Sequence, residues 1–266
     1  MNVPTEYLEI ISKDKALNWE NHTYYKVANE NHFWIDGRFS NFLQCIQKLN
    51  IKTDKTLTGL DIGCGNCVTS TMIEKCTEWT VHGADLDLSG LKYKNQGRGK
   101  VFLYDILEKN EKFREQYDFL VLFDVLEHIK DTQSFLKACL FHLKSNGYLF
   151  INVPALPFLM SSYDTVQGHY RRYTKKSLFI LLHNTNIQVL NHRYWGFLML
   201  LPAYLRKLKP EEKGNVDEII SNGFQPKNDL IHNILRLMIK FELHCLPKSL
   251  IGTSLMAITQ KRSKWL

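Results

Sequence analysis

Residues 57–67 read LTGLDIGCGNC, a short apolar run that ends in Gly63 and Gly65, two glycines separated by one residue. An apolar run of this length bounded by turn residues is typical of a buried parallel strand. Glycines directly after such a strand allow the backbone to turn tightly and to approach a ligand closely. Residues 68–75 can begin a helix, whose first N–H groups would point into the turn. The stretch therefore predicts a cofactor-binding loop in an α/β sheet.

The glycine spacing argues against two common nucleotide-binding loops. A dinucleotide fingerprint requires a third glycine where this chain has Val68, and a phosphate loop requires a Gly-Lys-Ser/Thr ending that is absent here. The remaining marker is Asp61, which lies two positions before Gly63. Cys64 and Cys67 form a C-x-x-C within the loop, but no second pair follows, so the packing of small residues in a turn is favoured over zinc or redox chemistry.

Acidic residues mark the ends of four predicted strands. Strands are predicted at 57–62, 80–84, 101–104, 119–123, 148–153, 188–194 and 254–259. The first four are associated with Asp61, Asp85, Asp105 and Asp124. Alternating strands and helices indicate a doubly wound, mostly parallel seven-stranded sheet, whose ligands bind at the carboxyl ends of the strands. An acid about 20 residues after the glycine loop is well placed to accept hydrogen bonds from ribose hydroxyls, and Asp85 fits, with Asp87 able to share or replace it.

Composition narrows the class of protein. The chain has 266 residues, of which 44% are hydrophobic, which is enough to bury the core of one α/β domain with additions or of two small domains. The net charge of +7 is dispersed, so it does not indicate a nucleic-acid binder, and it would suit an anionic membrane surface or an acidic substrate equally well. Six cysteines without framework spacing suggest reduced thiols. No signal pattern or membrane span is evident, so we expect a cytoplasmic protein, with peripheral contact to the membrane surface as an alternative.

We expect three regions. Residues 1–50 are rich in aromatic side chains and predict a helical N-terminal lid, with helical apolar spacing from Ile35 onward. Residues 51–194 together with 251–262 form the predicted cofactor-binding core, and residues 195–250 form a helical insertion before the last strand. The lid could cover the cofactor or simply pack on the sheet. The insertion could cap an apolar substrate pocket, lie on a membrane surface or supply ordinary core helices.

Four further stretches resemble a known family. They are YDFLVLFDVLEHIKD at 117–131, LKSNGYLFINVPA at 143–155, HFWIDGR at 32–38 and GHYRRYTKKSL at 168–178. Together they resemble class I S-adenosylmethionine-dependent methyltransferases of the bacterial type 11/12 group, similar to the ubiquinone-pathway O-methyltransferases. The glycine loop matches the family's Asp/Glu-x-Gly-x-Gly-x-Gly motif except at Cys67. The resemblance covers most of residues 30–190. It implies a Rossmann-like fold, S-adenosyl-L-methionine as cofactor and S-adenosyl-L-homocysteine as product.

The resemblance and the residue chemistry together nominate the site. The expected cofactor-binding residues are Asp61, Gly63, Gly65, Asp85, Asp105, Ile106, Asp124 and Arg38. Among them, Asp105 is expected to meet the adenine amino group, Ile106 to pack on the ring, and Arg38 to face the cofactor carboxylate or the substrate.

The loop after the fifth predicted strand supplies the substrate and catalytic candidates. Its expected substrate-binding residues are Tyr163, Arg171, Arg172 and Tyr173. The expected catalytic residues are His128, His169 and Asp164. Two adjacent arginines can hold a phosphate or carboxylate, and a histidine or aspartate near the methyl group can accept a proton. A surface turn whose arginines pair with nearby acids is the structural alternative.

A metal is not expected, but one alternative stays open. Asp124, Glu127 and His128 resemble a metal-ligand pattern of some ubiquinone-pathway and small-RNA methyltransferases, with Asp124 where glutamate is usual. Oxygen ligands with one imidazole would suit a hard ion such as magnesium.

The favoured function is methyl transfer to an oxygen, or a nitrogen, of a small-molecule, lipid-linked or glycan acceptor. Two other classes are kept. One is an NAD-dependent oxidoreductase on the same type of sheet, against which the missing third glycine argues. The other is a catalytically silent partner subunit with the same fold. An RNA methyltransferase stays open as a subtype, supported only by the modest positive charge. Nucleic acid is not the expected partner, because the sequence has no separate basic or aromatic RNA-binding module.

Overall fold

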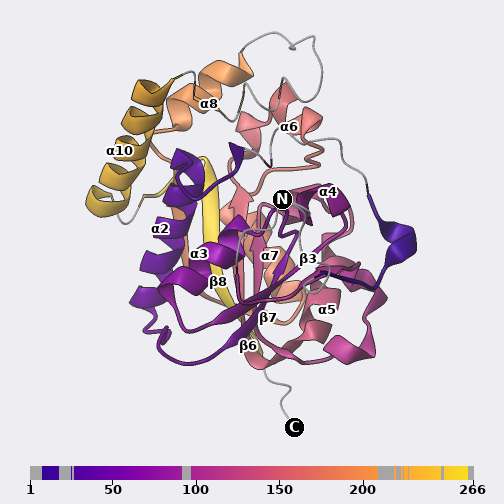
Figure 1. The fold of residues 1–266 in the computed structure, drawn as a ribbon. Coiled ribbons are helices and arrows are strands. Elements are labelled where there is room, and N and C mark those ends of the chain that lie inside the picture. Colours follow the sequence, from indigo (N-terminus) through magenta and orange to yellow (C-terminus); the bar gives the residue numbers. More distant parts are fainter. Residues whose placement is uncertain are drawn as a thin grey trace.

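A mixed sheet of eight strands runs through the centre of the molecule (Figure 1). The structure is a computed structural model that describes residues 8–17, 25, 27–91, 97–208, 219, 223, 225–226, 228–246 and 249–262. The strand order is β1-β4-β3-β2-β5-β6-β8-β7. The strands are β1 (Leu8–Ile10), β2 (Thr58–Ile62), β3 (Thr80–Asp85), β4 (Val101–Leu103), β5 (Tyr117–Phe123), β6 (Leu143–Pro154), β7 (Ile187–Trp195) and β8 (Ser254–Lys261).

The sheet is parallel from β1 to β6, and β8 then pairs antiparallel with both β6 and β7. All seven predicted strands are present, with ends that differ by a few residues. The prediction of seven strands in total was wrong by one, because β1 comes from the region expected to be helical. Its three residues pair with Val101–Leu103 at the edge of the sheet. A run this short carries no periodicity that sequence reasoning can detect. Residues 1–7, 18–24 and 26 of the expected lid lie outside the described residues.

Helices cover both faces of the sheet. The α-helices are α2 (Phe33–Lys48), α3 (Val68–Cys76), α4 (Leu88–Leu91), α5 (Thr132–His142), α6 (Ser162–Val166), α7 (Lys175–Asn184), α8 (Leu200–Lys207) and α10 (Asp229–Cys245). Short 3-10 turns are η1 (Lys13–Lys15), η2 (Ile106–Glu108), η3 (Glu111–Phe113), η4 (Leu126–His128) and η5 (Pro157–Leu159). Asp131 caps the N-terminus of α5, because its side chain accepts a hydrogen bond from the Ser134 N–H at 3.0 Å.

The apolar run of strand β5, residues 119–123, is buried on both faces of the sheet. Leu120 and Leu122 face a core that includes side chains of α5 and α7. Phe119, Val121 and Phe123 face the opposite core, which includes side chains of α2, α3 and α10. Burial on both faces of the sheet favours apolar side chains, which explains the continuous apolar run from Phe119 to Phe123.

Helix α10 packs on α2, outside the sheet (Figure 1). Gly37 of α2 makes the close approach possible, because a Cβ there would lie 2.6 Å from Cγ2 of Ile239. In the part of the chain that the structure describes, no helix is long and apolar enough to cross a lipid bilayer.

Candidate active site

The glycine loop turns at the carboxyl end of β2. Gly63 and Gly65 have φ values of +72° and +53°, a left-handed conformation that glycine adopts without strain. A Cβ on Gly63 would also lie 2.9 Å from the Val125 side chain. The N–H of Gly65 donates a hydrogen bond to the Asp85 carboxylate at 2.7 Å. The acid at the end of β3 therefore holds the loop, as well as standing where the ribose is expected.

The other strand-end acids lie at the same edge of the sheet but in different environments. Asp87 accepts a hydrogen bond from the Tyr25 hydroxyl at 2.6 Å, whereas Asp85 accepts the N–H groups of Gly65 and Asp87. Asp105 caps η2 by accepting the Leu107 N–H at 2.9 Å. Ile106 is buried in the hydrophobic core, so the structure does not present its side chain at the surface where an adenine ring was expected to pack.

Arg38 and Asp124 form an ion pair between α2 and the end of β5, with 2.6 Å between Nη1 and Oδ2. Arg38 also donates to the Thr69 hydroxyl at 3.0 Å. Asp124 accepts a second hydrogen bond, at 2.6 Å, from Asn152, whose oxygen in turn accepts from the Trp195 indole N–H at 2.8 Å. Asn152 was missed in the sequence, although a polar residue inside the apolar run of β6 is a signal that could have found it.

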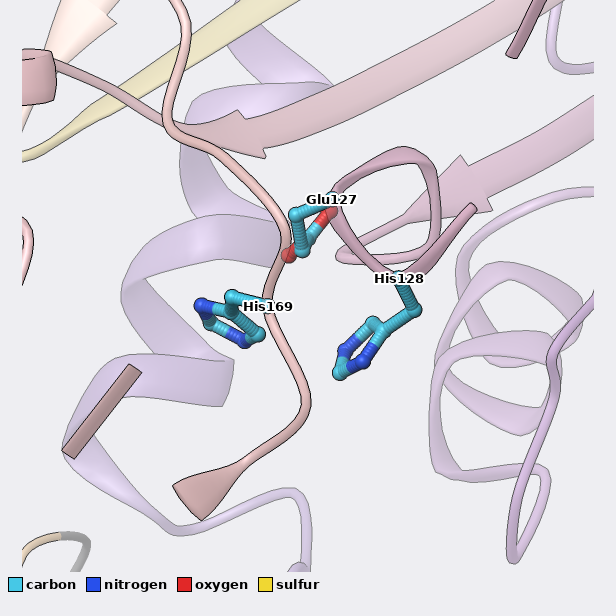
Figure 2. Close-up of side chains that lie close together, drawn as sticks. All are labelled: Glu127, His128 and His169. Atoms are coloured by element: carbon cyan, nitrogen blue, oxygen red, sulfur yellow. The ribbon is translucent and has the colours of Figure 1, made fainter. Parts of the chain in front are cut away.

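A second polar cluster joins η4 to the loop after α6. Figure 2 shows Glu127 and His128 on one turn and His169 on the facing loop, with the three side chains grouped together. One candidate ligand atom from each lies within 4.8 Å of the others. The rings of His128 and His169 meet edge to face, with centroids 4.7 Å apart. The two histidines predicted as catalytic are thus neighbours in space.

Asp164 contacts this cluster through His169. It is fully buried, and its carboxylate accepts hydrogen bonds from His169 Nδ1 at 3.0 Å and from Arg172 Nε at 2.9 Å. Burial alone would raise the pKa of Asp164, but the hydrogen bond from His169 and the Arg172 guanidinium outweigh burial and hold this pKa well below its usual range. Because an ionised carboxylate can only accept, His169 donates through Nδ1, and Nε2 is left as the basic nitrogen of the ring.

The remaining members of the cluster are shaped by burial. Burial lowers the pKa of His128 to about 4, and the neighbouring His169 lowers it too, so this imidazole is neutral near pH 7. Glu127 is 1% exposed, and burial raises the pKa of its carboxyl well above the ordinary value, with the Asp124 charge adding to the effect. Among the residues that the structure describes, none forms a hydrogen bond with Oε2 of Glu127.

The structure separates the predicted arginine pair. Arg172 is held by Asp164 and also donates to the Ala155 carbonyl at 3.1 Å, whereas Arg171 donates to the Lys130 carbonyl at 2.9 Å. They therefore do not form one anion-binding pair, because adjacent residues in this extended segment turn to different partners. Asp164 is likewise not placed to take a proton from a substrate, because its buried carboxylate accepts hydrogen bonds from His169 and Arg172.

The two predicted substrate tyrosines are also held by the protein. Tyr173 is 3% exposed and donates to the Leu126 carbonyl at 3.0 Å, so it belongs to the core rather than to a substrate surface. Tyr163 lies under the Arg206 guanidinium, 4.3 Å from its ring centroid.

Asp61 makes the stability of the protein depend on pH. Its carboxyl is 3% exposed, and burial raises its pKa to about 7 although Ser70 donates a hydrogen bond to it at 2.8 Å. The unfolded chain loses this proton near pH 3.9, so between about pH 4 and pH 7 only the folded state retains it. The stability that this proton contributes is complete below about pH 4 and is lost as the pH rises through 7.

The Asp61→Asn variant keeps an acceptor for Ser70 but has no charge. We therefore predict that its stability relative to wild type increases as the pH rises. Relative to wild type, its free energy of unfolding should increase by about 2 kcal/mol between pH 5 and pH 7.5. Urea unfolding at both pH values measures this difference. A difference that is the same at the two pH values would contradict the prediction.

Comparison with known proteins agrees with this geometry. A family model described as "Methyltransferase domain" matches residues 36–196. The chain is 30% identical over 133 residues to a ubiquinone biosynthesis O-methyltransferase of Shewanella sp. (strain ANA-3), covering 48% of this chain and 55% of that protein. It is 30% identical over 115 residues to the protein of the same name from Histophilus somni (strain 2336), covering 40% and 48%. The chain thus spans about half the length of these curated relatives.

Solved structures share the fold at low sequence identity. A SAM-dependent methyltransferase from Archaeoglobus fulgidus is 16% identical with a TM-score of 0.54, covering 90% of this chain and 100% of that one. Phosphoethanolamine N-methyltransferase 2 from Haemonchus contortus, solved in complex with S-adenosyl-L-methionine, is 17% identical with a TM-score of 0.53, covering 84% and 52%. The family resemblance and the Rossmann-like class I fold predicted from the sequence are both confirmed.

Proposed function

This chain belongs to the methyltransferase domain family, and from that membership we propose that it transfers a methyl group from S-adenosylmethionine to a hydroxyl oxygen of a small-molecule acceptor. The observation that carries the proposal is the contact between the glycine loop and Asp85 at the carboxyl edge of the sheet. The names of the curated relatives support oxygen as the acceptor atom, and nitrogen remains the alternative. Lipid-linked and glycan acceptors are the finer classes to test.

The residues present fit this cofactor. Gly63 and Gly65 have positive φ values, and a Cβ on them would lie 2.9 Å from Val125 and 3.1 Å from Tyr25, so the tight turn of the loop requires glycine at both positions. The Asp85 carboxylate can accept hydrogen bonds from ribose hydroxyls, and Asp105 stands at the end of β4 on the same edge. The sulfonium of the cofactor supplies an electrophilic methyl group, so the chain's main tasks are to bind, align and exclude water.

We assign proton removal to His169. A bound cofactor would supply its methyl carbon to the acceptor oxygen, and its sulfur would keep the electron pair of the broken carbon–sulfur bond. The hydroxyl proton passes to Nε2 of His169, whose Nδ1 is engaged by Asp164 at 3.0 Å. Asp164 is therefore a positioning residue that sets the orientation and tautomer of the imidazole.

Calorimetric titration with S-adenosylmethionine, S-adenosylhomocysteine and NAD tests the cofactor class. We expect micromolar binding of the first two and none of NAD. Binding of NAD alone would favour the oxidoreductase, and binding of none of the three would favour the silent partner subunit. Transfer of a labelled methyl group to panels of phenolic, lipid-linked, glycan and amine acceptors then identifies the acceptor class.

The polar cluster supports a second candidate role, the binding of a divalent transition-metal ion. Glu127, His128 and His169 offer one carboxylate and two imidazoles within 4.8 Å of one another, and Oε2 of Glu127 has no hydrogen-bond partner in the described part of the chain. The ligand set differs from the one considered from the sequence, because Asp124 is engaged by Arg38 and Asn152. Two imidazoles with one carboxylate suit zinc, manganese or iron better than magnesium.

A bound cation would act as a Lewis acid and would occupy the nitrogen assigned above to the base, so the two roles exclude each other. Titration with Mn²⁺ followed by electron paramagnetic resonance measures binding without activity. We expect Glu127→Gln to weaken Mn²⁺ binding at least tenfold and the exposed control Glu111→Gln to leave it unchanged. Equal binding by wild type and Glu127→Gln, or methyl transfer that survives removal of metal by a chelator, would favour the base.

A further inference from the structure

Two helices of the 195–250 segment carry large apolar side chains on their solvent side. We call these side chains the outer apolar face. They are Leu201, Tyr204, Leu205 and Leu208 at α8 and Leu230, Ile234, Leu237 and Phe241 on α10. Each of the eight is between 45% and 69% exposed. Their spacings of three, four and seven residues place each set on one side of its helix. Figure 1 shows both helices outside the sheet, at the upper left of the molecule.

Packing among the residues that the structure describes does not account for this face. Helix α10 already buries a separate stripe, including Ile239 and Leu243, in the core that it shares with α2. A helix that covers a core requires one apolar stripe, whereas α10 has a second one turned to solvent. Single exposed apolar residues are ordinary on a protein surface, but eight in two helical stripes mark an interaction surface.

The charges beside the face indicate what it contacts. Arg206 and Lys207 end α8, and Arg236 and Lys240 lie on α10 beside Asp36 of α2. The α8 and α10 helices contain only two acids, the buried Glu242 and Asp229 in the first turn of α10. Apolar stripes bordered by basic side chains are typical of helices that lie in the interface of an anionic bilayer.

We propose that the outer apolar face docks the protein onto the surface of an anionic lipid bilayer, with α8 and α10 lying along the interface. The two helices carry four basic side chains against the acids Asp229 and Glu242. This local excess favours an anionic bilayer over a second copy of the chain, because two copies would bring the same basic side chains together. Apolar side chains would enter the boundary of the acyl chains, while the exposed lysines Lys207 and Lys240 would meet the lipid phosphates.

This face is joined to the candidate base by one segment. Lys207 Nζ of α8 donates to the Phe158 carbonyl in η5, and the Arg206 guanidinium stacks on Tyr163 of α6. The same segment continues to Asp164 and His169, and the Phe158 side chain is itself 56% exposed. An acceptor dissolved in the bilayer would therefore be delivered beside His169, an extension that rests on the proposed function. Docking itself does not depend on methyl transfer.

Co-sedimentation of the full chain with large unilamellar vesicles tests the proposal. Vesicles of phosphatidylcholine alone are compared with vesicles that contain phosphatidylglycerol as the anionic lipid. We expect binding to the anionic vesicles that falls as salt is added. Leu237→Asp and Leu205→Asp should each lower the partition constant about tenfold or more, because each places a charge in the acyl boundary.

The matched control is Ile180→Asp on α7, where an isoleucine is 52% exposed away from this face, and it should bind like wild type. Calorimetric titration with S-adenosylhomocysteine checks that each variant keeps its fold. This readout is separate from vesicle binding. If the proposed function is wrong, S-adenosylhomocysteine binding is lost while vesicle binding remains. Absence of binding to anionic vesicles, or wild-type binding by both aspartate variants, would overturn the proposal. So would a concentration-dependent dimer in sedimentation equilibrium that Leu237→Asp dissociates, because the face would then be covered by a second copy.

Discussion

Replacement of Asp85 by alanine is expected to weaken binding of S-adenosylmethionine about 100-fold, because a charged acceptor contributes roughly 1.5–3 kcal/mol to each hydrogen bond that it receives. The structure adds a second cause. The same carboxylate accepts the Gly65 N–H at 2.7 Å, so the variant loses both the expected ribose acceptor and the group that holds the glycine loop. Calorimetric titration with S-adenosylmethionine and S-adenosylhomocysteine measures the loss.

Two further variants separate Asp85 from its neighbours. Glu111→Ala removes an exposed acid far along the chain from the loop and should bind like wild type. Asp87→Ala removes the partner of the Tyr25 hydroxyl, and we expect it to weaken binding less than Asp85→Ala does. Wild-type affinity in Asp85→Ala, or a larger loss in Asp87→Ala, would reject the assignment of the ribose acceptor to Asp85.

Replacement of His169 by alanine is expected to lower the rate of methyl transfer about 100- to 1,000-fold while leaving the affinity for S-adenosylmethionine unchanged. The reason is that the ring supplies the proton acceptor, whereas the glycine loop and Asp85 stand at the ends of β2 and β3. Single-turnover transfer of labelled methyl to the acceptor found by screening measures the rate. His183→Ala, at an exposed position of α7, is the matched control.

Asp164→Asn tests the positioning role beside the base. The amide keeps the shape of the side chain but cannot hold both His169 and Arg172 as a carboxylate does. We expect a smaller loss of rate than in His169→Ala, with cofactor affinity retained. An unchanged rate in His169→Ala would show that this loop has a structural role and that deprotonation occurs elsewhere.

The strands were predictable because each is an apolar run bounded by turn residues. The seven predicted runs became β2 to β8, and Asp61, Asp85, Asp105 and Asp124 lie at one edge because parallel topology brings the carboxyl ends of strands together. Strand β1 could not be predicted, since its three residues have no strand pattern of their own and are extended only because β4 offers an open edge.

The polar cluster could be only partly predicted. The residues of interest were recognised, but their partners were not, because Glu127 and His169 are 42 positions apart and meet only where η4 faces the loop after α6. Arg172 and Tyr173 look like substrate ligands in sequence. Their side chains nevertheless satisfy Asp164 and the Leu126 carbonyl, contacts that no local pattern reveals.

Local sequence was sufficient for the fold class, the glycine loop and the edge of the sheet where a cofactor would lie. These depend on hydrophobic runs and backbone conformations that short stretches specify through their own composition. Tertiary structure alone decided which polar groups pair, that His128 and His169 adjoin buried Glu127, and that α8 and α10 leave an apolar face in solvent. Such features depend on burial and on neighbours that are distant in the chain. Burial shifts the pKa values of the polar groups, and the distant neighbours decide which hydrogen bonds form and which surfaces stay exposed.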